Sequence, residues 1–280
     1  MRRLILILAT LAFAACAGAS PAASPAGSAA TGPPTSVIVR AVEYRFDMPA
    51  NWPSGWVTVT LVNDGGQPHQ LQLARLRPGA SLEQIRSDFA GNPAAAFALL
   101  VLAGGPDTVD PGLGQQVTVW LDSGSYVALD LSAGSDGVQN VNHDMLQAFT
   151  ADQPAIQTEP LARGTLVERS FGYDLPPLAA GPVVLRVEDR SSEDDHEAAI
   201  VQPAAGKGVA DVLAFLRAPE GPPPFRLMGG LAAMEPGQSG FLRLDLDPGS
   251  YVILCLVTDP ATGRFHFDEG MIQAFTVTAR

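Results

Sequence analysis

The chain contains few cysteines, few histidines and few basic residues. Of its two cysteines, Cys16 lies in an N-terminal leader and Cys255 in the globular part, so the globular part can form no internal disulfide. An unpaired thiol in an oxidising compartment is open to oxidation unless it is buried or occupied. This favours a specific role for Cys255.

Charge argues against a nucleic-acid partner, and hydropathy argues against a membrane-spanning helix after the leader. Acidic residues outnumber basic ones by 29 to 17, and Arg2 and Arg3 belong to the leader. Such a surface repels nucleic acid and anionic lipid headgroups, so we expect no nucleic-acid partner, and a soluble partner would be basic. After the leader, no stretch reaches the ~20 apolar residues of a membrane-spanning helix. The longest apolar run, PAAAFALLVLAGG (93–105), predicts a core helix.

The N-terminus has the layout of an export signal. In MRRLILILATLAFAAC, two arginines precede a short apolar run and small residues lead into Cys16. Residues 1–16 resemble a bacterial lipoprotein signal, which implies that Cys16 is lipidated; the alternative is an ordinary secretory signal cut nearby. Residues 17–35 are rich in Pro, Ala, Ser and Gly and predict a disordered tether. We therefore expect an exported protein of the cell envelope, anchored to the outer face of the membrane by lipid alone.

An internal repeat covers nearly everything after the tether. YRFDMP (44–49) matches FGYDLP (171–176), and GGPDTVDPG (104–112) matches GGLAAMEPG (229–237). The ends of the two copies also match, from SGSYVALDL to QAFTA and from PGSYVILCL to QAFTV. The repeat predicts two tandem domains, residues 36–151 and 162–280, joined by a linker at 152–161.

Each copy has the pattern of β-strands. FLRLDLD (241–247) alternates apolar and charged residues, as a strand with one buried face does. YVILCLV (251–257) is apolar throughout, which is typical of a central strand covered on both faces. One helix-like segment lies in each copy, at 81–100 and 209–218. The fold class predicted is all-β, with two tandem antiparallel Greek-key β-sandwiches that each carry one short helical insertion.

The second copy contains a set of residues that could bind a metal. A histidine follows the second strand of each copy (His69 and His196), but only His196 is followed by Cys255, His266 and Met271. This order resembles the cupredoxins, the blue-copper family, and HFDEGM (266–271) is similar to the His-x3-Gly-Met ending of copper nitrite reductases and multicopper oxidases. The resemblance implies one type 1 copper in the second domain, with Cys255 as thiolate, His196 and His266 as equatorial ligands and Met271 as the axial ligand.

Each of these residues also has a simpler interpretation. A buried cysteine is usually a small core residue, Met271 could be a packing residue, and His196 in SSEDDHE could be a solvated loop histidine. The first copy gives an internal comparison. Alignment places Asp130 opposite Cys255, Asn140 opposite His266 and Met145 opposite Met271, so no blue-copper site is expected there, although His69 and His143 could form a makeshift site.

The resemblance implies electron transfer with a redox partner protein. The alternative is a metal-free cupredoxin-fold module that binds or scaffolds at the cell surface. Copper oxidases and nitrite reductases need further copper centres built from several additional histidines, and this chain has four histidines in total. We therefore expect a protein that is not an enzyme.

Overall fold

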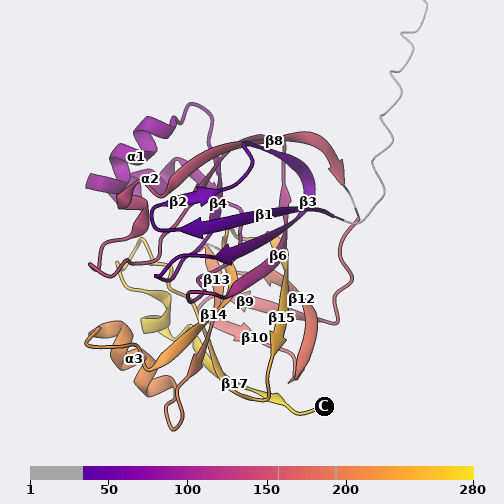
Figure 1. Ribbon diagram of the computed structural model, residues 1–280, viewed down its shortest axis with the longest axis vertical. Helices are drawn as coiled ribbons and strands as arrows, with labels where there is room; N and C mark the ends of the chain where they lie inside the picture. The colour runs from indigo at the N-terminus through magenta and orange to yellow at the C-terminus, as the bar shows by residue number, and fades with distance from the viewer. Residues whose placement is uncertain (1–33, 157, 193) are drawn as a thin grey trace, which may run out of the picture.

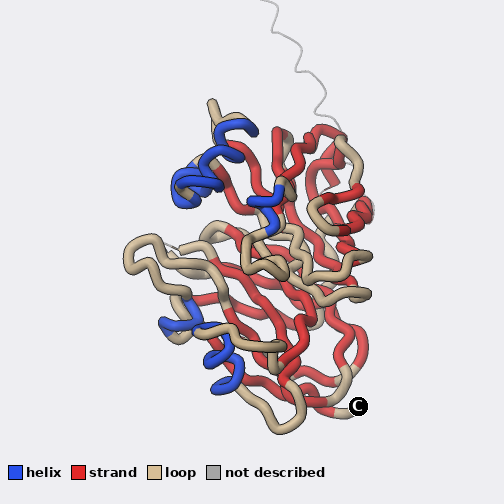
Figure 2. The backbone as a smooth tube through the Cα atoms, turned by 60° about the vertical axis from the view of Figure 1, so that its left-hand side comes forward, coloured by secondary structure: helices blue, strands red, loops and turns tan. Residues whose placement is uncertain are grey.

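The computed structural model describes residues 34–156, 158–192 and 194–280. The leader with Cys16 and residues 17–33 of the predicted tether lie outside the described residues. Each repeat forms one β-sandwich, and the two units are stacked along the long axis of the molecule (Figure 1). Strands make up most of both units, and most of the helical segments lie along one side (Figure 2). None of the described helices combines the length and apolar character needed to span a lipid bilayer.

The first unit consists of two sheets that share one long strand. Its strands, in chain order, are β1 (Thr35–Val42), β2 (Arg45–Asp47), β3 (Asn51–Asn63), β4 (Gln72–Leu76), β5 (Leu100–Leu102), β6 (Gly114–Leu121), β7 (Gly124–Leu129) and β8 (Leu146–Ile156). The strand orders are β2-β1-β3-β6 and β8-β7-β4-β5. Because β3 pairs with β6 along most of its length and with β8 at its beginning, the two sheets are continuous.

The second unit repeats this arrangement with separate sheets. Its strands are β9 (Gly164–Arg169), β10 (Gly172–Asp174), β11 (Leu178–Ala179), β12 (Gly181–Asp189), β13 (His196–Pro203), β14 (Phe225–Met234), β15 (Ser239–Leu246), β16 (Gly249–Leu254) and β17 (Ile272–Thr278). One sheet has the order β10-β9-β12-β15 and the other β11-β17-β16-β13-β14. The predicted all-β architecture is confirmed, although β1–β3, β12–β9, β3–β8 and β11–β17 pair in parallel rather than antiparallel.

Burial follows the predicted strand patterns. In β15, Leu242, Leu244 and Leu246 are buried, whereas Arg243 and Asp245 are exposed. Strand β16 is buried on both faces for a specific reason. Its odd-numbered residues Tyr251 and Ile253 face the core between the sheets, and its even-numbered residues Val252 and Leu254 pack beneath helix α3 (Val209–Arg217).

The predicted helix at 81–100 is divided. Helix α1 (Leu82–Gly91) begins at Ser81, whose hydroxyl accepts a hydrogen bond from the Gln84 N–H at 3.1 Å. It ends before Pro93, which starts α2 (Pro93–Ala98), because proline disfavours a helical conformation in the residue before it. The first unit therefore has two helices rather than the one predicted, and the run 93–105 is not a single core helix, because β5 follows α2 directly.

The two units are joined by strand pairing about a pseudo-twofold axis. β6 pairs antiparallel with β15, with Val117 opposite Leu242, which are equivalent positions of the repeat. A second contact joins residues 103–110 to 227–234, where the Gly104 N–H donates to the Ala233 carbonyl (2.9 Å) and the Ala232 N–H to the Gly105 carbonyl (2.8 Å). The repeated glycine motifs thus form the junction. In addition, β8 continues to Ile156, into the segment 152–161 predicted as a linker.

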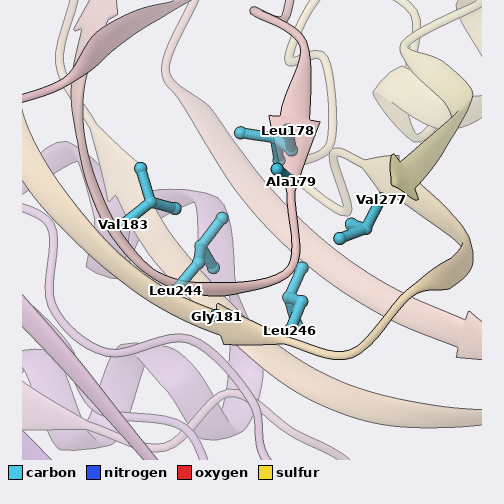
Figure 3. A pocket seen from close by; sticks show the side chains of 7 residues that line it. All are labelled: Leu178, Ala179, Gly181, Val183, Leu244, Leu246 and Val277. Carbon is cyan, nitrogen blue, oxygen red and sulfur yellow. The ribbon is translucent and has the colours of Figure 1, made fainter. Parts of the chain in front are cut away.

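An apolar crevice lies between the sheets of the second unit. Its lining residues come from β11, β12, β15 and β17 and are Leu178, Ala179, Gly181, Val183, Leu244, Leu246 and Val277 (Figure 3). The space is too narrow to hold a water molecule. The crevice is therefore a packing gap and not a ligand site.

Within each unit, the glycine motif requires glycine at one of two equivalent positions, Gly105 and Gly230, where the backbone of a neighbouring strand comes close. A Cβ at Gly105 would lie 2.0 Å from the Leu71 carbonyl oxygen, and a Cβ at Gly230 would lie 2.0 Å from the Ala198 carbonyl oxygen. Because both glycines also have positive φ, we expect Gly230→Ala to lower the free energy of unfolding by about 3 kcal/mol or more. Denaturant unfolding of the full chain measures this.

A glycine from the same motif provides the control. Gly237 also has a positive φ (81°), but a Cβ there would meet nothing within 4 Å. Gly237→Ala should therefore cost only the left-handed conformation, about 1–2 kcal/mol. Equal losses for Gly230→Ala and Gly237→Ala would contradict the close approach of Gly230 to the Ala198 carbonyl.

Candidate metal centre

Four buried residues from three segments of the second unit meet at one end of the sandwich. His196 starts β13, Cys255 directly follows β16, His266 starts the 3-10 helix η2 (His266–Glu269), and Met271 directly precedes β17. All four are fully buried. The pairing of β13 with β16 brings the first two together, with Ala199 opposite Leu254. The interpretation of His196 as a solvated loop histidine is therefore wrong, because this end of the acidic segment folds into the sheet.

The donor atoms of three of these residues converge. His196 Nδ1 lies 3.0 Å from His266 Nδ1, and Cys255 Sγ lies 3.4 Å from the same His266 nitrogen. The ligand atoms of these three residues all lie within 4.8 Å of one another. In the described part of the chain, no other group of three or more His, Cys, Asp or Glu residues brings its ligand atoms together in this way. Two imidazole nitrogens and a thiol that face one another in a buried space are the donor set that suits copper.

The hydrogen bonds of the site leave its histidines available to a cation. The Nε2 atoms of His196 and His266 are buried and have no hydrogen-bond partner among the described residues. Their Nδ1 atoms face each other, and that of His266 also faces Cys255 Sγ. A metal ion bound between these donors would satisfy lone pairs that otherwise face only each other and a thiol. The residues present therefore fit a copper ion.

Backbone hydrogen bonds hold the ligand loop closed. The Cys255 N–H donates to the Met271 carbonyl (3.1 Å) and the Met271 N–H donates to the His266 carbonyl (2.9 Å). The His266 N–H donates to the Val257 carbonyl (2.9 Å). The residues between Cys255 and His266 form a hairpin, closed by the bond from the Asp259 N–H to the Arg264 carbonyl (2.9 Å), so these two side chains still meet.

Burial determines the protonation of the metal-free site. Burial first, and then the neighbouring His266, lowers the pKa of His196 to about 4, and burial also lowers the pKa of His266. Burial, and next the charge of Glu197, raises the pKa of Cys255 well above its usual value. Backbone hydrogen bonds at Glu197 and Val257 act in the opposite direction by favouring the thiolate. Near neutral pH, His196 and His266 are therefore neutral and Cys255 holds a proton.

Glu197 is a structural residue of the site that the sequence did not reveal. It is buried, its Oε1 accepts a hydrogen bond from the Leu256 N–H at 2.7 Å, and it thereby ties β13 to the segment after Cys255. Burial, and next the charge of Asp107, raises its pKa well above the usual value. In the sequence, the one feature that indicates a role of Glu197 at the site is its position directly after His196. A glutamate within an acidic run is more commonly exposed to solvent.

The equivalent position of the first unit has the same backbone arrangement but lacks the cysteine and the second histidine. Asp130, Asn140 and Met145 occupy the places of Cys255, His266 and Met271, as the alignment predicts. The Asp130 N–H donates to the Met145 carbonyl (3.2 Å) and the Met145 N–H to the Asn140 carbonyl (3.0 Å), the same bonds that close the second unit. His69 Nδ1 lies 2.6 Å from Asp130 Oδ2, and Asn140 Nδ2 donates to the same oxygen at 3.1 Å. A buried hydrogen-bonded cluster thus replaces the ligand set.

The makeshift site of His69 and His143 does not form. His69 is fully buried, whereas His143 lies half-buried at the surface, where its Nε2 is 2.9 Å from Asp136 Oδ2 and its ring contacts Tyr44.

Comparison with known proteins gives matches in structure only. No protein-family model and no curated protein sequence matches the chain. Among solved structures, auracyanin from Roseiflexus castenholzii is 24% identical over 41% of this chain and 95% of its own, with a TM-score of 0.29. Auracyanin A, described as a "blue" copper protein from Chloroflexus aurantiacus, is 16% identical over 42% of this chain and 99% of its own, with a TM-score of 0.30. Copper nitrite reductase from Nitrosomonas europaea is 13% identical over 89% of this chain and 94% of its own, with a TM-score of 0.25.

Proton release should accompany copper binding. Because Cys255 is protonated and His196 is neutral near pH 7, we expect about one proton to be released for each Cu(II) bound, and the apparent affinity to rise about tenfold per pH unit between roughly pH 6 and 8. Calorimetric titration in buffers of different ionisation enthalpy measures the proton count. Binding without proton release would contradict the protonated thiol or its coordination.

The first unit should become a copper site when its two differing donors are restored. In a Cys255→Ser background, we expect Asp130→Cys combined with Asn140→His to produce an intense visible band with Cu(II), because His69 and the closing hydrogen bonds are already in place. Asp130→Cys alone leaves His69 without its partner, which should cost roughly 1–3 kcal/mol of stability. Absorption spectra and denaturant unfolding measure the two effects, and a folded, colourless double variant would contradict the equivalence of the sites.

Proposed function

We propose that this protein is a single-copper electron carrier whose copper site lies in the second unit. The observation that supports this most strongly is the buried convergence of His196 Nδ1, His266 Nδ1 and Cys255 Sγ. A trigonal set of two imidazoles and one thiolate suits both copper oxidation states, and the bound copper would supply reversible one-electron chemistry. The chain contributes a site that is already folded and needs little rearrangement between the two states.

Each proposed ligand has a distinct role. Cys255 supplies the thiolate, and the backbone hydrogen bonds at Glu197 and Val257 stabilise its negative charge. His196 and His266 supply the equatorial nitrogens. Met271 is the proposed axial ligand, because it is fully buried in the same core cluster as Cys255 and its backbone is hydrogen-bonded to both His266 and Cys255.

We propose a carrier rather than an enzyme, although copper nitrite reductases and multicopper oxidases are among the solved structures that align with the chain. Catalysis by those classes needs additional copper ligands, and this chain has four histidines, two of which are assigned to the copper site. Of the others, His69 is paired with Asp130 and His143 with Asp136. Assays for nitrite reduction and oxygen consumption by the copper-loaded protein test this proposal, and turnover of either substrate would contradict it.

The alternative function, a metal-free binding or scaffold module, is favoured by one observation. The first unit closes the same loop around a hydrogen-bonded cluster of His69, Asp130 and Asn140, so this architecture can form without a metal. A wild-type protein that stays colourless with excess Cu(II), after reduction of its thiol, would leave this alternative as the function.

The proposed partner and location follow from the sequence. Net charge at pH 7 is −12, which favours a basic redox partner protein. The lipoprotein-like leader supports export and anchoring through Cys16 in the cell envelope, where an electron carrier held by a tether could reach partners at the membrane surface. Mass spectrometry of the mature N-terminus would identify a lipidated Cys16 directly.

Two ligand substitutions should have different spectroscopic effects. Cys255→Ser should abolish the intense visible band of the copper-loaded protein, because that transition needs a sulfur donor, while Cu(II) remains weakly bound to the histidines. Met271→Leu should keep the band and raise the reduction potential, because an axial donor that favours the oxidised ion is lost. Absorption spectroscopy and potentiometric titration measure both.

The equivalent residue of the first unit provides a matched control. Met145→Leu removes the same sulfur from an equally buried position beside Asp130 rather than beside a copper ligand. It should leave the band and the potential unchanged. A shift in potential with Met145→Leu as large as with Met271→Leu would mean that Met271 acts through general packing and not as a ligand.

A further inference from the structure

Both proposed histidine ligands are sealed from solvent, and one aromatic side chain lies against both of them. His196 and His266 have no exposed surface. The ring of Phe171 meets the His266 ring edge-on, with centroids 5.2 Å apart and an interplanar angle of 83°, and it meets the His196 ring at 6.4 Å and 74°. Phe171 is itself only partly buried, so a residue that reaches the surface contacts both buried imidazoles.

The turn that carries Phe171 is held against both ligand segments. Phe171 lies between β9 and β10, where Gly172 pairs with Arg169. The Tyr173 hydroxyl donates to the Glu197 carbonyl at 2.6 Å, which ties the start of β10 to the residue after His196. On the other side, a Cβ placed on Gly270 would lie 3.9 Å from the Phe171 carbonyl oxygen, so the turn also rests on the corner that leads from His266 to Met271.

In the equivalent turn of the first unit, the aromatic side chain contacts a histidine at a different position. Tyr44 occupies the place of Phe171 and has nearly the same left-handed backbone, with φ 63° against 62°. Its ring packs on the half-buried His143, at a centroid distance of 4.5 Å, and 40% of Tyr44 is exposed. The left-handed turn is therefore a property of the fold, whereas an aromatic ring over two buried imidazoles is particular to the second unit.

We propose that Phe171 is the cover of the metal centre, a positioning residue that keeps water and small anions away from the ligands and thereby keeps the reduction potential high. The effect on potential rests on the proposed copper site. The oxidised copper–thiolate centre carries one more positive charge than the reduced centre, so an apolar cover that excludes water favours the reduced state. The effect on access concerns the protein alone and does not require a metal.

The first experiment uses the full chain without metal. Iodoacetamide alkylates the thiolate of Cys255, so the reaction is run at one fixed alkaline pH, and peptide mass spectrometry follows the rate at that residue in wild type, Phe171→Gly, Phe171→Leu and Tyr44→Gly. Glycine suits the left-handed turn, so neither glycine variant adds backbone strain. We expect severalfold faster alkylation in Phe171→Gly only, with Phe171→Leu close to wild type because leucine still fills the space. Equal rates in wild type and Phe171→Gly, or equal acceleration by Tyr44→Gly, would overturn the proposal.

The second experiment uses the same chains loaded with Cu(II). We expect Phe171→Gly to have a lower reduction potential than wild type and a visible spectrum that changes on addition of azide, a small anion that binds copper. Tyr44→Gly should match wild type in both. An unchanged potential together with an unchanged response to azide would overturn the role of Phe171 even if alkylation is faster. A wild-type protein without a visible band would overturn the proposed copper function, while the alkylation rates would still decide whether Phe171 covers the site.

Discussion

Both sites share a pair of backbone N–H groups directed at one side chain, a carboxylate in the first unit and a thiol that can become a thiolate in the second. In the first unit, the N–H groups of Gln70 and Ser132 donate to Asp130 Oδ1, at 3.2 and 2.9 Å. In the second unit, the equivalent residues Glu197 and Val257 provide the backbone hydrogen bonds that favour the Cys255 thiolate. Buried N–H donors without acceptors are costly, so each unit places an anion, or a group that can become one, at this position.

What surrounds that position decides whether a metal is needed. Asp130 receives hydrogen bonds from Asn140 and Ser132 and lies beside His69, so the Asp130 carboxylate is satisfied by side chains of the first unit, although His69 Nε2 and Asn140 Oδ1 have no partner among the described residues. In the second unit, the same neighbourhood consists of two neutral imidazoles, hydrogen-bonded through their Nδ1 atoms, and a thiol, and these three groups are good ligands for copper. Changes of side chain at three equivalent positions, Asp130/Cys255, Asn140/His266 and Ser132/Val257, thus separate a structural cluster from a proposed redox centre.

The junction between the units relates these two sites in space. β6 and β15 continue one sheet across the pseudo-twofold axis, and the glycine motifs make the second contact. Gln70, next to His69, donates through Nε2 to Asp107 at 2.9 Å and also hydrogen-bonds Glu197, next to His196. The first unit therefore contacts the residue next to the proposed copper ligand His196.

The sequence by itself determined the repeat, the all-β class and the equivalence of Asp130 with Cys255, of Asn140 with His266 and of Met145 with Met271. These properties follow from strand periodicity, turn residues and the alignment of the two copies, none of which requires knowing which segments touch in the fold. Pro93 was also a local indication, although the division of the helix there was not predicted.

Only the tertiary structure decided how distant segments meet. The burial of His196 within an acidic run, the tie made by Glu197, the shared sheet and the ring of Phe171 over both histidines each depend on strands that are far apart in the chain. No periodicity within one segment reports such contacts, because the free energy of burial is set by whichever segment covers the residue. The order of residues in the sequence was sufficient to identify the proposed ligands. Their burial results from the packing of β9, β13 and β16.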